Sequence, residues 1–121
     1  MIAGLAAAVL AAMLACVHTF VGGRAIARPL RQATDLPTVV RATSWMCWHM
    51  VTTTLFLMAI LLFWGAWGGR PDLILAGTLL AAAVALGGLA AAPALGVGYR
   101  VLPQGWLFVP VVALGLWSFY A

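Results

Sequence analysis

Four long apolar runs, none of which contains a charged residue, constrain the fold of this chain more than any other feature. They cover residues 2–23, 44–67, 73–92 and 105–121. A helix rises about 1.5 Å per residue, so about 20 apolar residues cross the ~30 Å hydrocarbon core of a bilayer. Backbone in lipid must satisfy its own hydrogen bonds, which favours helices. We therefore predict one all-α domain over residues 1–121, an integral membrane bundle of four transmembrane helices in up-down topology.

The segment 24–43 is the only sizeable polar part of the chain, and we expect it to form a cytoplasmic loop. Helical spacing of its arginines indicates that the first helix extends past the bilayer until Pro29 ends it. A second helix is expected to begin near Pro37, with Asp35 close to its cap. The last run has 17 residues, which is short for a crossing, and Pro110 is expected to bend it.

The composition supports a membrane location. Hydrophobic residues make up 66% of the 121 residues and charged residues only 7%, whereas a soluble domain carries roughly a quarter charged residues. A membrane β-barrel would show short segments of alternating polarity, which are absent. The formal net charge of +4 comes from arginines in short connections, so we expect no nucleic-acid partner.

The arginines predict the orientation of the helices in the membrane. The first and third connections carry five of the six: Arg24, Arg28, Arg31, Arg41 and Arg100. Because arginine is enriched in cytoplasmic loops, both termini are expected on the non-cytoplasmic side, in a bacterial inner membrane. All six tryptophans lie near the ends of the runs, as aromatic belts do. One role for four of these arginines is contact with acidic lipid headgroups or an acidic partner: Arg24, Arg28, Arg31 and Arg41. The alternative is that they serve only as this orientation signal.

Small residues recur every four positions in two of the runs. In the first run they are Ala3, Ala7, Ala11, Ala15, Thr19 and Gly23, and in the third Gly77, Ala81, Ala85, Gly88 and Ala92. Such stripes let helices approach closely in lipid. The expected partners are therefore the lipid bilayer, other membrane-protein subunits or a second copy of the chain.

Two histidines, His18 and His49, are the main candidates for a cofactor site, because an ionisable side chain inside a membrane indicates function. They are equally far from the centre of the polar loop, and each lies about five residues, or ~7 Å, inside the membrane boundary. On adjacent antiparallel helices they would share one level. Paired imidazoles at one level are suited to be axial ligands of haem b or a chlorin pigment.

A copper site is the alternative use of these histidines. Met46 and Met50 lie beside His49, and with His18 they would supply soft nitrogen and sulfur ligands. Each histidine also follows a cysteine in a Cys-x-His pattern, but residues two apart point to opposite sides of a helix, which excludes a Cys2His2 zinc site. In a third interpretation the protein binds no cofactor, and each histidine forms a hydrogen bond to a threonine hydroxyl or a backbone carbonyl.

No catalytic residues are expected, and we do not interpret the chain as an enzyme. Its only acids, Asp35 and Asp72, fall on opposite sides of the predicted membrane. The leading hypothesis is an accessory or assembly subunit of a larger inner-membrane complex, such as a respiratory or photosynthetic one. The alternative is a haem-, pigment- or copper-binding redox protein using His18 and His49. A weaker hypothesis is a small-solute or lipid carrier with a cavity around His49 and residues 52–54.

Overall fold

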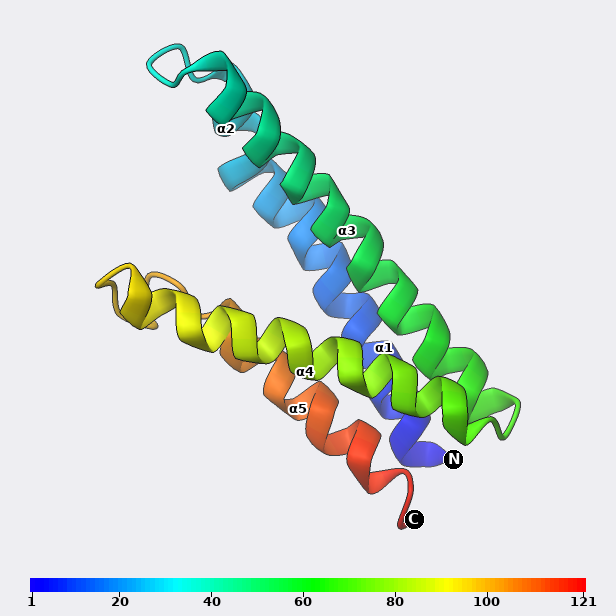
Figure 1. Cartoon of the computed structure of the whole chain (residues 1–121). Helices are drawn as coiled ribbons and strands as arrows, with labels where there is room; N and C mark the ends of the chain where they lie inside the picture. The colour runs from blue at the N-terminus through cyan, green and yellow to red at the C-terminus, as the bar shows by residue number, and fades with distance from the viewer.

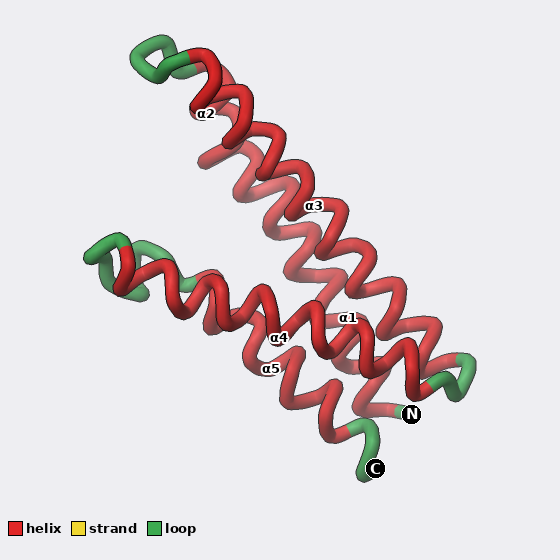
Figure 2. The backbone as a smooth tube through the Cα atoms, in the orientation of Figure 1, coloured by secondary structure: helices red, strands yellow, loops and turns green.

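A computed structural model describes all 121 residues, and the chain is helical with no strand. The elements are α1 (Ile2–Cys16), the π-helix η1 (Val17–Ala27), α2 (Arg28–Gln32), α3 (Thr38–Trp67), α4 (Pro71–Ala94) and α5 (Gln104–Trp117). Short loops join them (Figures 1 and 2). Three helical stretches, Ile2–Gln32, Thr38–Trp67 and Pro71–Ala94, are long and apolar enough to cross a membrane. The prediction of an all-helical chain with helices able to cross a membrane is confirmed for three of them.

The first stretch is one continuous helix of 31 residues, formed by α1, η1 and α2. Its middle third is a π-helix, in which hydrogen bonds run from residue i to i+5. The helix continues past Pro29 to Gln32, so the expectation that Pro29 ends it was wrong. Pro29 lies where the π-helix η1 passes into α2, and its fixed φ is compatible with the helical backbone there.

The polar segment 24–43 is mostly helical, and only 33–37 is irregular. Pro37 precedes the first residue of α3, Thr38, which agrees with the predicted start of the second helix. Arg41 Nη1 donates a hydrogen bond to the Ala33 carbonyl oxygen at 2.8 Å. This bond connects α3 to the end of the loop and holds the hairpin of the first stretch and α3 closed.

A tight turn joins α3 to α4. Gly69 has φ of +62°, a conformation that glycine adopts without steric cost, and the Arg70 N–H donates to the Gly65 carbonyl at 2.8 Å. Arg70 also forms an exposed ion pair with Asp72, with 2.7 Å between Nη2 and Oδ2. Its hydrogen bond to this carboxylate raises the pKa of the Arg70 guanidinium above its ordinary value.

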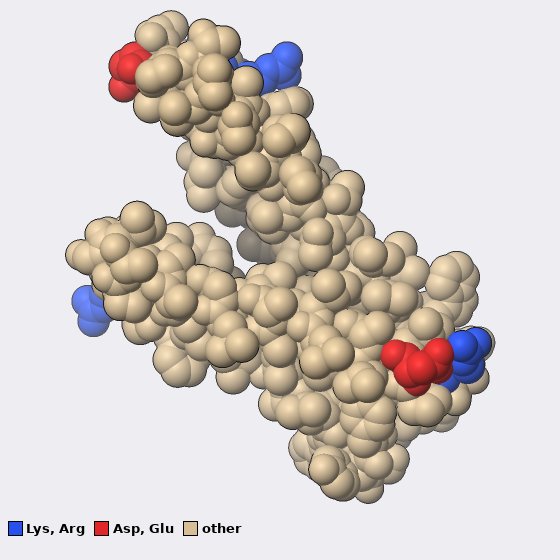
Figure 3. All heavy atoms as spheres, viewed as in Figure 1, with Lys and Arg blue, Asp and Glu red and all other residues tan.

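The helices form two antiparallel pairs that share one end of the molecule. The first stretch pairs with α3, and α4 pairs with α5 (Figure 1). The pairs diverge from the end that holds both termini, so the loop after α2 and the connection between α4 and α5 lie far apart (Figure 1). The space-filling view shows a notch between the two arms, with the visible charged side chains at the ends of the molecule (Figure 3).

The buried core lies at the shared end. Buried residues on α1 run from Gly4 to Ala15, and those on α3 begin only at Leu55. Members of both small-residue stripes are buried here: Ala7, Ala11 and Ala15 on α1, and Gly77, Ala81 and Ala85 on α4. Both stripes therefore serve packing within the molecule.

The last helix, α5, has 14 residues and spans about 21 Å, less than the ~30 Å hydrocarbon core. It is shorter than the predicted run 105–121, because 118–120 form a turn at its end. Pro110 lies inside it, and the bend expected there stays a prediction. The fourth crossing and the up-down topology in a membrane stay predictions.

Candidate functional site

His18 lies in η1 and contacts α3 directly. Its ring stacks on the Trp48 ring, with centroids 4.1 Å apart and planes at 15°. Its Nε2 lies 3.1 Å from Thr52 Oγ1 and 3.4 Å from the Trp48 carbonyl oxygen. Because Trp48 immediately precedes His49, both histidines lie at the same level of the helix pair, as their spacing predicts.

The hydrogen bonds around Thr52 indicate which nitrogen of His18 carries a proton. Thr52 Oγ1 donates to the Trp48 carbonyl at 3.1 Å, so its single proton is used within α3. It therefore accepts a hydrogen bond from His18, which places a proton on Nε2. A metal or haem iron ligated through Nε2 would have to break this bond, whereas Nδ1 stays available as an acceptor.

His49 has a different environment from His18. Its ring meets the Trp45 ring edge-on, with centroids 4.1 Å apart and planes at 67°. The Arg31 guanidinium carbon lies 5.4 Å from the Trp45 ring centroid, a favourable cation–π position. Neither nitrogen of the His49 ring makes a hydrogen bond within the protein. The side chain of His49 is therefore free to donate to a bound group.

A cavity of about 240 Å³ lies between η1, α2 and α3; we call it the arginine pocket. Its lining residues are Thr19, Gly23, Ala27, Arg28, Arg31, Trp45, Trp48, His49 and Thr52. The lining contains two guanidinium groups and no carboxylate. The hydroxyl protons of Thr19 and Thr52 are donated to backbone carbonyls of their own helices. The ionic or imidazole donors that face the pocket are therefore those of Arg28, Arg31 and His49, which favour an anion.

The structure separates the four arginines that the sequence treats alike. Arg28 and Arg31 line the arginine pocket, Arg24 lies beside a different cavity with Phe20, and Arg41 binds the Ala33 carbonyl. None of the four forms an ion pair, since the single salt bridge of the chain joins Arg70 and Asp72 at the other end of α3. This division could not be predicted from the sequence, because it depends on how the helices are rotated about their axes.

The tentative copper ligands next to His49 point outward. Met46 and Met50 are 52% and 58% exposed, and Cys16 and Cys47 are free thiols at the surface. No three side chains of histidine, cysteine, aspartate or glutamate lie close enough together to hold a metal ion. The roles of His18 and His49 as ligands of haem, a chlorin or copper stay predictions.

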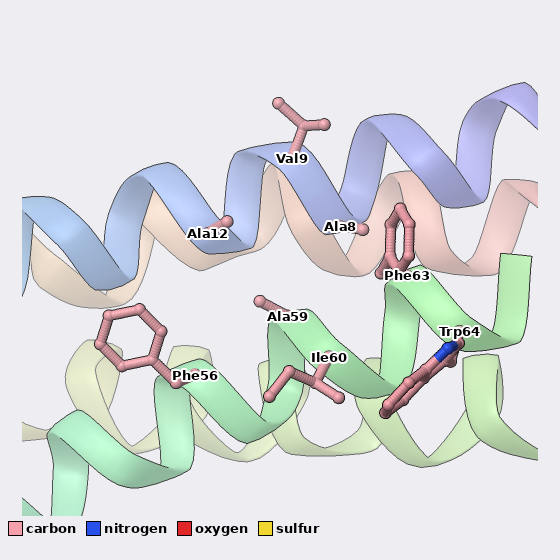
Figure 4. A pocket seen from close by; sticks show the side chains of 8 residues that line it. All are labelled: Ala8, Val9, Ala12, Phe56, Ala59, Ile60, Phe63 and Trp64. Atoms are coloured by element: carbon pink, nitrogen blue, oxygen red, sulfur yellow. The ribbon is translucent and has the colours of Figure 1, made fainter. Parts of the chain in front are cut away.

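A second hollow, entirely apolar, lies between α1 and α3 closer to the shared end (Figure 4). It has a volume of about 420 Å³ and is lined by Ala8, Val9, Ala12, Phe56, Ala59, Ile60, Phe63 and Trp64. Phe56 and Phe63 stand on either side of Ala59, which with Ala8 and Ala12 leaves space between the rings (Figure 4). Its chemistry suits an acyl chain or an apolar side chain.

Comparisons with models of protein families, with curated proteins and with solved structures found no match. Two features of the site were not predicted from the sequence: the π-helix η1 and the cavity that Gly23 and Ala27 leave beside α3. The repeated small residues at 19, 23 and 27 are the signal that could have indicated such a space.

Proposed function

We propose that this chain is an accessory or assembly subunit of a larger inner-membrane complex, such as a respiratory or photosynthetic one. In this proposal four helices cross the membrane in up-down order, with 33–37 in the cytoplasm and both termini on the opposite side. The excess of arginine in the first and third connections supports this orientation. Local thinning of the bilayer or a neighbouring subunit would accommodate the short α5.

The observation that carries the proposal is the unburied half of α3. From Trp45 to Trp67 α3 rises about 33 Å, which matches the ~30 Å core, so in this proposal both tryptophans lie at membrane interfaces. Yet no residue of α3 before Leu55 is buried. In the half of the membrane nearer the arginines, the first stretch and α3 therefore stand as a two-helix hairpin without cover from α4 and α5.

Large apolar side chains cover this half of the hairpin. The exposed ones are Val17, Phe20, Val21, Met46, Met50 and Val51. Methionine adapts to irregular surfaces and is common where helices dock. Lipid tails and protein side chains are equally apolar, so moving an apolar side chain from lipid to protein gains little. Helices in a membrane therefore associate through close packing. The notch between the two arms offers a concave surface on which a partner helix would contact both pairs (Figure 3).

A photocrosslinking experiment in native membranes tests the proposal. A photoreactive amino acid replaces Met50, in the uncovered half of α3, or Leu79, which is equally exposed but lies on α4 beside the core. We expect Met50 to give an adduct with a larger membrane protein that co-purifies in mild detergent, and Leu79 to give mainly lipid adducts. A lone monomer in mild detergent, with no protein adduct from Met50, would contradict the proposal.

A further inference from the structure

We propose that the arginine pocket binds the phosphate of one anionic phospholipid from the cytoplasmic leaflet. The guanidinium groups of Arg28 and Arg31 and the ring of His49 hold the phosphate oxygens. One acyl chain of the same lipid follows the groove between α1 and α3. This site goes beyond the proposed role as a subunit and rests only on the membrane orientation proposed above.

The charges around the pocket support an anion. Arg28 and Arg31 face the same cavity from one turn of α2, and neither is paired with a carboxylate. Arg31 is held over the Trp45 ring, which is in edge contact with His49. Three donors from two helices therefore surround one space. Guanidinium groups bind phosphate through paired, charge-assisted hydrogen bonds, and two positive charges facing one cavity repel each other unless an anion lies between them.

The depth of the pocket favours a lipid phosphate over a soluble one. Trp45 and Trp48 line the pocket and lie about 33 Å and about 29 Å along α3 from Trp67, so the pocket is at the level of the headgroups. Basic pockets between helices at this level on the cytoplasmic side bind acidic lipid heads. A phospholipid reaches the site by moving sideways in its own leaflet.

The apolar hollow between α1 and α3 lies further along α3 from the arginine pocket and would receive an acyl chain. On the continuous helix α3 the lining residues of both hollows recur every three or four positions: Trp45, His49, Thr52, Phe56, Ile60 and Phe63. Residues with this spacing share one side of a helix. From His49 to Phe56 the helix rises about 10 Å, which is within the ~15 Å depth of one leaflet. The headgroup site and the near end of the apolar hollow are thus within reach of one lipid.

The first test compares two double variants with the same change in charge. Arg28→Gln with Arg31→Gln removes the donors of the pocket, while Arg24→Gln with Arg100→Gln removes two arginines outside it. Native mass spectrometry of the purified protein measures retention of phosphatidylglycerol and phosphatidylcholine from mixed micelles. We expect the intact protein to retain one phosphatidylglycerol in preference to phosphatidylcholine. The pocket variant should bind it about tenfold or more weakly, because two charge-assisted hydrogen bonds are lost, and the control should change less than about twofold.

The second test changes the space and leaves the charge intact. A Cβ on Gly23 would meet no atom within 4 Å, and the same holds for Gly87 on α4. Gly23→Leu is therefore expected to reduce the volume of the pocket, which Gly23 lines, and Gly87→Leu is the matched control. We expect Gly23→Leu to lose the retained phosphatidylglycerol and Gly87→Leu to keep it. The helicity of both variants, measured by circular dichroism, should be unchanged.

Three outcomes would overturn the assignment. Equal weakening in the two arginine double variants would show general attraction of lipid to a basic surface. Equal retention of phosphatidylcholine and phosphatidylglycerol would show that the phosphate charge is not recognised. Displacement of the lipid by millimolar inorganic phosphate or glycerol phosphate would identify a soluble anion as the occupant.

Discussion

Gly88 of α4 and Gly105 of α5 bring two helix backbones into direct contact. A Cβ placed on Gly88 would lie 2.6 Å from the Gly105 Cα and 2.7 Å from its backbone nitrogen. Non-bonded heavy atoms around a Cβ essentially never approach within 3.0 Å, so neither glycine has room for a side chain. The contact fixes the start of the short α5 against the second half of α4, and Gly115 makes a similar close approach to Thr78 near the other end of α5.

Replacing Gly88 by leucine should therefore separate α4 from α5. We expect a loss of about 1–3 kcal/mol in the free energy of unfolding, the usual cost of overpacking a closely fitted contact. Reversible unfolding in mixed micelles, followed by circular dichroism, measures it. Gly87→Leu is the control, because the neighbouring position faces open space. If both variants are equally stable, α4 and α5 do not pack through Gly88.

Thr52 provides a second prediction, because its hydroxyl joins two helices. Thr52→Val keeps the shape of the side chain but leaves the His18 Nε2 without its closer partner. We expect a destabilisation of about 0.5–1.5 kcal/mol, the range for hydrogen bonds between membrane helices. Thr53→Val is the matched control, since the Thr53 hydroxyl bonds only to the Met50 carbonyl of its own helix. A loss in Thr53→Val as large as in Thr52→Val would contradict a bond across the hairpin.

The helices themselves could be predicted because a membrane-spanning segment needs only length and the absence of charge. The start of α3 at Thr38 follows from Pro37, and its end at Trp67 from the Gly68-Gly69 turn. The π-helix could not be predicted, because its backbone differs from an α-helix by hydrogen bonds that no side-chain pattern specifies. The divergence of the two helix pairs was also missed, since it depends on packing between small residues far apart in the chain.

The relative level of the two histidines could be predicted from the sequence, but the rotation of their helices could not. Equal distances from the loop place His18 and His49 at one level, and the contact of His18 with Trp48 agrees with this. Apolar residues surround each helix, so the sequence does not indicate which face meets its neighbour. For this reason the pairing of His18 with Thr52 and the convergence of Arg28 and Arg31 appear only in three dimensions.

The orientation in the membrane is a third prediction. In a background with Cys16 and Cys47 replaced by alanine, Thr34→Cys reports on the loop after α2 and Tyr120→Cys on the C-terminus. Positive-inside orientation predicts that a membrane-impermeant maleimide labels Tyr120→Cys on intact spheroplasts and Thr34→Cys only after lysis. Labelling of both cysteines from the same side would show that α5 does not return the chain across the membrane.

The histidines provide the last prediction, which separates a binding role from redox chemistry. If His18 and His49 ligate haem or a chlorin, the purified protein has a Soret or near-infrared band, and His18→Ala and His49→Ala each abolish it. If they hold copper with Met46 and Met50, metal analysis finds copper that is lost in the same histidine variants. We expect neither signal, because the Nε2 of His18 donates to Thr52 and its ring is stacked on Trp48, while Met46 and Met50 are directed outward. Absorption spectra of the oxidised and reduced protein, together with iron and copper analysis, distinguish these possibilities. A band or a bound metal that is lost in both histidine variants would support the redox hypothesis.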